Sequence, residues 1–115
     1  MAYRTTDKMA RRKQERRRHL LDTAVDLFGR QGYHATTVPM IVEAARSSTG
    51  SFYFYFRNKE DVFAAALEDL GERLSEALNE AIAREAQPVA QMRAAVEGLF
   101  LFLAENPERA RILIV

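Results

Sequence analysis

The stretch SSTGSFYFYFRNKE, residues 47–60, decides the fold. It sets five consecutive aromatic residues between a run of small polar residues and a charged segment. On a helix, Phe52 and Phe56 lie four residues apart and share one face, so they can pack into a core while the three rings between them point elsewhere. Ser48 and Thr49 are both suited to cap the start of such a helix. The stretch therefore predicts a short helix with a buried aromatic edge and a small-residue N-terminal end.

The flanking segments predict further helices. One begins near Arg11, carries apolar residues at helical spacing, and ends before Gly32. A shorter one starts at Thr37, whose side chain can accept a hydrogen bond from a first-turn amide. Asn58 can cap a long helix, with Asp61 placed to reach back as in a capping box. The later helix breaks fall at Gln87-Pro88 and Asn106-Pro107. We predict an all-α chain in which Phe52 and Phe56 pack on Leu21, Val25 and Phe28.

Charge is distributed unevenly, although the net charge is only +1. Residues 1–62 carry twelve Lys or Arg and seven Asp or Glu, whereas residues 63–115 carry five and nine. This uneven distribution suggests that the N-terminal part faces a polyanion and that the rest of the chain has a different role. The basic residues before His19 can lie along a DNA backbone, with Arg4 and Lys8 in a mobile arm that can enter a minor groove. The alternative is a solvated charged surface.

Two short helices joined by a tight turn form a helix-turn-helix, in which the second helix enters the major groove and its N-terminal residues meet base edges. Gly50 would let the backbone of this helix come close to the bases. The hydroxyls of Tyr53 and Tyr55 can bond phosphate oxygens, and Lys59 adds a cation at the start of the next helix. Phe54 can stack on a sugar or a thymine methyl, or pack locally.

The segments LLDTAVDLFGRQGYHATTV (20–38) and IVEAARSSTGSFYFYFRNKEDVF (41–63) resemble the DNA-binding domain of TetR-family transcriptional regulators. The resemblance covers roughly residues 11–67, and NPERARIL (106–113) also resembles that family. It implies a ligand-responsive repressor that binds a palindromic operator in double-stranded DNA as a homodimer. A small-molecule effector would bind the C-terminal domain and move the long helix that starts near Lys59, which changes the spacing of the two recognition helices.

The resemblance also implies a division of the chain. We expect a flexible basic arm at 1–10, a three-helix helix-turn-helix DNA-binding domain at 11–58, and the start of a helical ligand-binding and dimerisation domain at 59–115. The apolar end of the sequence, RILIV, is a helix that has hardly begun, so we expect this last domain to be truncated, with its dimer interface beyond Val115.

Position by position, the resemblance places Thr37 near a phosphate and the residues from Ser48 to Ser51 at the bases. It places Tyr53, Tyr55 and Lys59 on the DNA backbone. The family usually has Gly-Val where this chain has Arg46-Ser47, and an Arg held at positive φ would cost about 1–2 kcal/mol unless the turn differs. The expected DNA-binding residues are Thr37, Arg46, Ser48, Thr49, Gly50, Ser51, Tyr53, Phe54, Tyr55 and Lys59.

Other classes of function find little support. His19 and His34 are not spaced as a metal pair, and we expect no metal and no cofactor. Carboxylates between Glu68 and Glu85 are expected on a solvated helix surface, so we predict no enzyme. No apolar run approaches the length of a membrane span, and there is no signal-peptide pattern or cysteine, so we expect a cytoplasmic protein. The alternative function is a helical ligand-binding or protein-interaction module whose basic arm meets an acidic partner.

Overall fold

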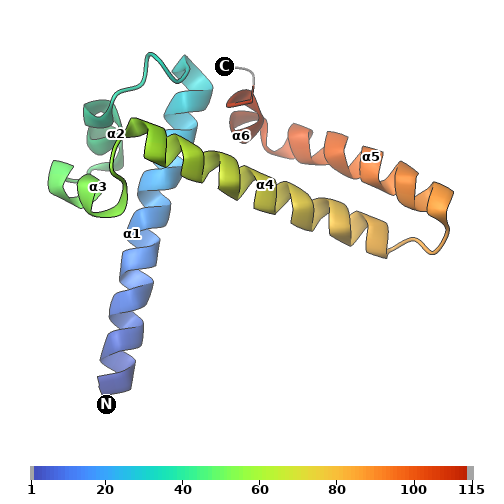
Figure 1. Cartoon of the computed structure of the whole chain (residues 1–115), viewed down its shortest axis with the longest axis horizontal. Helices are drawn as coiled ribbons and strands as arrows, with labels where there is room; N and C mark the ends of the chain where they lie inside the picture. Colours follow the sequence, from blue (N-terminus) through green and yellow to red (C-terminus); the bar gives the residue numbers. More distant parts are fainter. Residues whose placement is uncertain (1, 114–115) are drawn as a thin grey trace.

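The computed structural model describes residues 2–113, and the side chains of residues 6–113. Within them the regular structure is all helix and there is no strand, as the sequence predicts. α1, α2 and α3 gather at one end, and α4 and α5 form an antiparallel pair that leads away from them (Figure 1). The helices are α1 (Ala2–Gln31), α2 (Val38–Ala45), α3 (Thr49–Tyr55), α4 (Lys59–Ala83), α5 (Pro88–Glu105) and α6 (Pro107–Arg111).

The first helix begins earlier than the sequence analysis expects. α1 starts at Ala2 rather than near Arg11, so the residues expected to form a separate arm belong to the helix. The reason is local: the segment has no Gly or Pro, and about half of its residues are Ala, Met, Arg or Lys, which are good helix formers. α1 ends at Gln31 because Gly32 takes a φ of 88°, which a side-chain-bearing residue rarely adopts.

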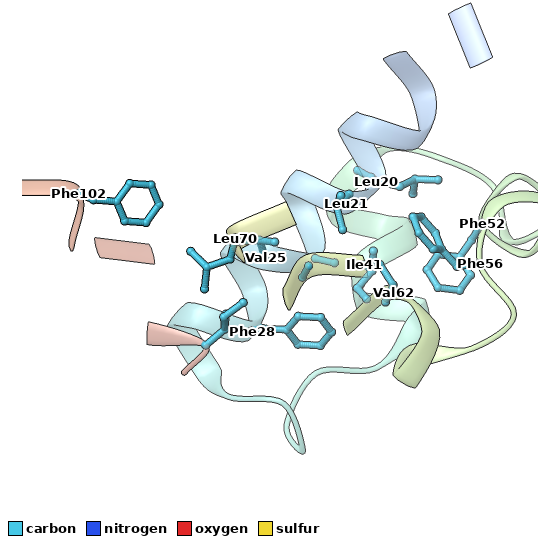
Figure 2. Close-up of a cluster of buried hydrophobic side chains, with 14 residues drawn as sticks. Leu20, Leu21, Val25, Phe28, Ile41, Phe52, Phe56, Val62, Leu70 and Phe102 are labelled. Atoms are coloured by element: carbon cyan, nitrogen blue, oxygen red, sulfur yellow. The ribbon is translucent and has the colours of Figure 1, made fainter. Parts of the chain in front are cut away.

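The main core lies where α1, α2, α3 and the start of α4 meet. Phe28, Phe52 and Phe56 are buried there together with aliphatic side chains of α1 and α2, as predicted (Figure 2). The rings of Phe52 and Phe56 lie 5.7 Å apart between centroids, so the buried edge of α3 is a single aromatic contact surface. The buried aliphatic residues around them are Leu20, Leu21, Val25, Ile41 and Val62.

Side-chain caps fix where the helices begin. Thr37 accepts a hydrogen bond from the Met40 amide (3.3 Å), and Ser48, rather than Thr49, accepts one from the Ser51 amide (3.0 Å). Asn58 caps α4 by accepting from the amide of Asp61 at 2.8 Å. These caps set the boundaries of α2, α3 and α4 at the positions that the sequence indicates.

The Asp61 carboxylate completes the start of α4. It reaches back to accept a hydrogen bond from the Arg57 amide at 2.9 Å. The partner is one residue earlier than in a standard capping box, in which the carboxylate would bind the amide of Asn58 itself. The turn between α3 and α4 is therefore fixed by two hydrogen bonds, one accepted by Asn58 and one accepted by Asp61.

The α4–α5 pair is much less buried than the region of α1–α3. Phe102 of α5 is buried, but Met92 and Phe100 are 72% and 66% exposed. Within the described residues these two side chains are therefore not part of a core. No helix among those residues has both the length and the apolar character needed to cross a membrane.

Candidate nucleic-acid interface

The turn between α2 and α3 is built on an arginine in the left-handed region. Arg46 has φ 54° and ψ 41°, and its amide bonds back to the Glu43 carbonyl at 3.1 Å. The Ser47 amide bonds to the Val42 carbonyl at 3.0 Å, which closes the end of α2. Of the two possibilities raised by the sequence, the turn thus keeps its geometry and Arg46 carries the backbone strain, about 1 kcal/mol.

α3 presents opposite faces to the protein and to solvent. Phe52 and Phe56 face the core, and Gly50 and Phe54 lie on the reverse side because they are offset from these two by about half a turn. Phe54 is 67% exposed. A Cβ atom added to Gly50 would meet no other atom within 4 Å. Nothing within the described protein therefore requires glycine at this position.

Tyr53 and the small residues at the start of α3 complete the exposed surface. Tyr53 is 51% exposed, and Thr49 lies one turn before it on the same side of the helix. Ser48 is exposed and Ser51 is half-buried. Thr37, at the start of α2, is exposed as well. The structure thus leaves most of the residues expected to bind DNA open to solvent.

Two of the expected residues are more engaged with the protein than the sequence suggests. Tyr55 is half-buried and packs against the core. The Lys59 ammonium donates a hydrogen bond to the Tyr33 carbonyl at 3.0 Å and lies 4.2 Å from the centroid of the Tyr33 ring. An ammonium has three donors, so Lys59 retains capacity for another acceptor while it ties the start of α4 to the loop after α1.

A shallow hollow lies between α1 and the α2–α3 turn. Arg16 and His19 of α1 line it together with Arg46, Ser48 and Ser51. With Ser47, which also lines the hollow, two cationic side chains and three hydroxyls converge beside the start of α3. The hollow depends on the tertiary packing of α1 against the turn, so the sequence, which marks Arg16 only as part of a basic run, does not place Arg16 or His19 beside Arg46.

His19 also ties α1 to the turn. Its Nε2–H donates to the Ala45 carbonyl at 2.9 Å. Ala45 is the last residue of α2, so this bond satisfies one of the carbonyls that a helix end leaves without a helical partner.

Two basic side chains of α1 contact the aromatic residues of α3. The Lys13 ammonium lies 5.7 Å from the centroid of the Phe54 ring, and the Arg17 guanidinium carbon lies 5.0 Å from that of Phe56. Cation–π contacts of this kind contribute about 0.5–1 kcal/mol at exposed sites. The Lys13 contact places positive charge of α1 beside the exposed face of α3, and the Arg17 contact lies at its buried edge.

A cluster of charges joins α1, α4 and α6 behind this surface. Arg18 and Arg73 each contact the buried carboxylate of Asp69 at 2.9 Å, and Arg109 donates to Asp22 at 3.1 Å. The Nε of Arg109 is 3.9 Å from Asp69 and has no hydrogen-bond partner. Burial raises the pKa of Asp69, but the hydrogen bonds from Arg18 and Arg73 outweigh burial and hold that pKa below its usual value. We call these five residues the ionic joint.

The ionic joint corrects the expectation that the carboxylates from Glu68 to Glu85 all lie on a solvated surface. Asp69 is 8% exposed and is paired with arginines from α1 and from its own helix. Close to this site, the backbones of α1 and α6 touch, because a Cβ on Gly29 would lie 2.6 Å from the Glu108 carbonyl oxygen. Both features involve partners distant in sequence, which the local pattern does not reveal.

Comparison with known proteins identifies the N-terminal part of the chain. Residues 20–66 match the model for the tetR family of bacterial regulatory proteins. An uncharacterized HTH-type transcriptional regulator of Bacillus subtilis (strain 168), YdgC, is 34% identical over 103 residues, which are 85% of this chain and 52% of that protein. The HTH-type transcriptional regulator HbdR of an Aromatoleum strain is 32% identical over 83 residues, or 72% and 36% of the two chains.

Solved structures give the same result. A TetR-like transcriptional regulator from Rhodococcus sp. RHA1 superposes with a TM-score of 0.79 at 34% identity, covering 85% of this chain and 54% of that one. A TetR-family transcription regulator from Marinobacter aquaeolei VT8 gives 0.83 at 25% identity, covering 90% and 54%. The chain thus spans between about a third and a half of the length of the relatives described.

Proposed function

The chain belongs to the tetR family of bacterial regulatory proteins, and from this membership we propose that it is a sequence-specific DNA-binding regulator of transcription. α2 and α3 are its helix-turn-helix, and α3 is the recognition helix. The observation that carries the proposal is the division of α3 into two faces. Phe52 and Phe56 anchor the helix in the core, while Gly50, Tyr53 and Phe54 are turned outwards.

Within this proposal the outward residues take separate roles. The segment from Ser48 to Ser51 meets base edges in the major groove, and Phe54 contacts a thymine methyl or a sugar. Thr37, Tyr53, Tyr55 and Lys59 hold phosphates. Their exposure supports this for Thr37 and Tyr53, whereas Tyr55 and Lys59 have less free surface and contribute less. Arg46 faces the hollow that it shares with Arg16, where a phosphate would lie between two cations.

We further propose a ligand-responsive repressor that acts as a homodimer on a palindromic operator. Residues 11–58 form the DNA-binding domain, and residues 59–115 belong to the domain for effector and partner. The ionic joint supports a coupling between these two domains, because it connects α6 and α4 to α1. A ligand that shifts α6 would move α1 and α4 with it and so change the spacing of the two recognition helices.

Gly50→Ala tests the proposal directly. The protein has space for the added methyl group, so folding should be unaffected or slightly favoured. A base pair approaching the backbone at that point would clash with the methyl group, so affinity for the operator should fall at least tenfold. Fluorescence anisotropy should be measured on a duplex that the full chain selects from a random-sequence pool, at two salt concentrations.

Gly71→Ala is the matched control. Gly71 lies in α4 and also has open space around its Cα, so this variant should bind the duplex like the wild type. Equal binding by the Gly50 variant would contradict the assignment of α3. Absence of salt-dependent DNA binding by the wild type would contradict the proposed function and favour a protein-interaction module with a basic helix.

Two further variants separate the two kinds of contact. Lys59→Ala should weaken binding to selected and unselected duplexes alike and lower the salt dependence by about one counterion. Thr49→Val should change the selected sequence while leaving the salt dependence intact. If the two variants behave identically, the division into phosphate and base contacts is wrong.

A further inference from the structure

The N-terminal half of α1 projects from the packed part of the protein, which it reaches through Lys13 and Arg16. Every side chain from residue 6 to residue 19 is exposed, and burial begins at Leu20. In Figure 1 this part of the helix projects well beyond α3 and α4. Its basic residues, with Arg4 included, are Arg4, Lys8, Arg11, Arg12, Lys13, Arg16, Arg17 and Arg18, against only Asp7 and Glu15.

Such a helix has little intrinsic stability. Its side chains are mostly polar and none of residues 6–19 is buried, so its stability depends largely on continuity with the packed turns after Leu20. Like charges lie four residues apart at Lys8 and Arg12, at Arg12 and Arg16, and at Lys13 and Arg17, and each pair repels by a few tenths of a kcal/mol. A row of anions along the helix would remove this repulsion. The segment is therefore suited to a polyanionic surface rather than to an apolar partner.

The contacts with α3 determine where that polyanion must lie. Lys13 is over the ring of Phe54, and Arg17 is over that of Phe56. Phe54 is on the exposed face of α3. Any duplex that meets this face therefore passes the projecting half of α1 as well. From Lys13 to Ala2 the helix extends about 16 Å at 1.5 Å per residue, or about five base pairs at 3.4 Å each.

We propose that the projecting half of α1 is a second DNA contact, which binds phosphates beside the site read by α3 and extends that site by about five base pairs. The inference rests on the proposed function. The contact is independent of sequence, because phosphates carry no base information. A helix about 10–12 Å across does not fit a minor groove about 6 Å wide, so the segment follows the backbone instead of entering the groove as an extended arm would.

Lys8→Gln/Arg11→Gln/Arg12→Gln in the full chain tests this proposal. The side chains of these three residues form no hydrogen bond, ion pair or ring contact with the rest of the described protein. The slope of log Kd against log salt should fall by about 2.7, or about 0.9 for each phosphate that the variant no longer neutralises. Affinity at about 0.1 M salt should fall at least tenfold, and the selected sequence should stay the same. The probes are the selected duplex with ten flanking base pairs on each side, and the same duplex trimmed to the selected core.

The trimmed duplex supplies a test that does not depend on the stability of a variant. Wild-type protein should lose affinity when the flanks are removed, and the triple variant should not. The control is Arg84→Gln/Arg93→Gln/Arg111→Gln, which removes the same charge from exposed positions on or next to α4, α5 and α6 and should remain sensitive to the flanks. A triple variant that responds to trimming like the wild type would overturn the proposal.

Other outcomes separate this inference from the proposed function. If the wild type selects no sequence but still loses salt-dependent affinity in the triple variant, the second DNA contact stands and the specific regulator does not. If anionic vesicles or an RNA duplex compete better than trimmed DNA of the same charge, the helix serves a different polyanion and the inference is wrong. Sequence selection with no effect of the triple variant would leave the regulator and refute the second DNA contact.

Discussion

Between the region of α1–α3 and the α4–α5 pair, the contrast lies in how completely apolar side chains are covered. Leu20, Phe28 and Phe52 are at most 1% exposed, whereas Val89 and Met92 are exposed by 70% and 72%. The first region is closed around its own core. In the second, α5 is covered on one side only, where it faces α4. The folding stability of the described chain is therefore concentrated in the part that presents α3, and α5 leaves an apolar face available for contact.

Phe52→Ala should have the largest effect and tests this contrast most directly. Phe52 is fully buried, so the variant loses both the burial of a ring and the packing around it, about 3–5 kcal/mol. Phe100→Ala is the matched control, because Phe100 is 66% exposed and should change the free energy of unfolding by less than about 0.5 kcal/mol. Urea titrations followed by circular dichroism measure both. Similar losses for the two variants would show that the two regions are equally well packed.

Asp69→Asn addresses the ionic joint, where the two regions meet. The change leaves Arg18 and Arg73 without their buried carboxylate. Removing one partner of a fully buried pair costs about 3–5 kcal/mol; these arginines are partly exposed, so we expect about 2–3 kcal/mol. Glu68→Gln, on the neighbouring exposed position, should cost little. An unchanged unfolding free energy for the Asp69 variant would mean that the joint contributes nothing to stability.

The same residue predicts a dependence on pH. The pKa of Asp69 is lowered in the folded chain, so its stabilising effect is complete above the unfolded pKa of about 4 and is lost as pH falls through the folded pKa. The stability difference between wild type and Asp69→Asn should therefore be constant near neutral pH and shrink below about pH 4. Urea titrations at a series of pH values would show this. A difference that persists at the lowest pH would contradict the assigned ion pairs.

Arg46→Gly should have the smallest effect, and in the opposite direction. Glycine occupies the left-handed region without the steric cost paid by Arg46, so the free energy of unfolding should rise by about 1 kcal/mol. DNA affinity should fall at the same time, because the variant removes one of the two arginines at the hollow. Thermal unfolding and anisotropy on the selected duplex measure the two effects. A more stable variant with unchanged affinity would show that the arginine has no role at the phosphate.

Local signals predicted much of the first region. Capping residues fixed the starts of α2, α3 and α4, and the four-residue spacing of Phe52 and Phe56 identified the buried edge of α3. The positive φ at Arg46 was one of the two possibilities raised by its departure from the family pattern, in which glycine is usual at this position. Each of these depends on a few neighbouring residues, which is why sequence alone was sufficient.

Features built from distant residues were not predicted. Asp69 meets Arg18, 51 positions earlier, and Arg109 meets Asp22 across 87 positions. The start of α1 was placed too late because charge was taken as a sign of an arm, while helix propensity and continuity with a packed helix decided the outcome. The DNA-binding roles of the residues around α3 remain predictions that the variants described above test.

The close approach at Gly29 has a mechanical consequence. Side chains between helices usually take up small movements by changing rotamer, but here a Cβ would already lie 2.6 Å from the Glu108 carbonyl oxygen. With backbone against backbone, there is no rotatable group to absorb a displacement. A movement of the start of α6 by a few tenths of an ångström towards α1 must therefore displace α1 itself, together with the basic segment at its far end.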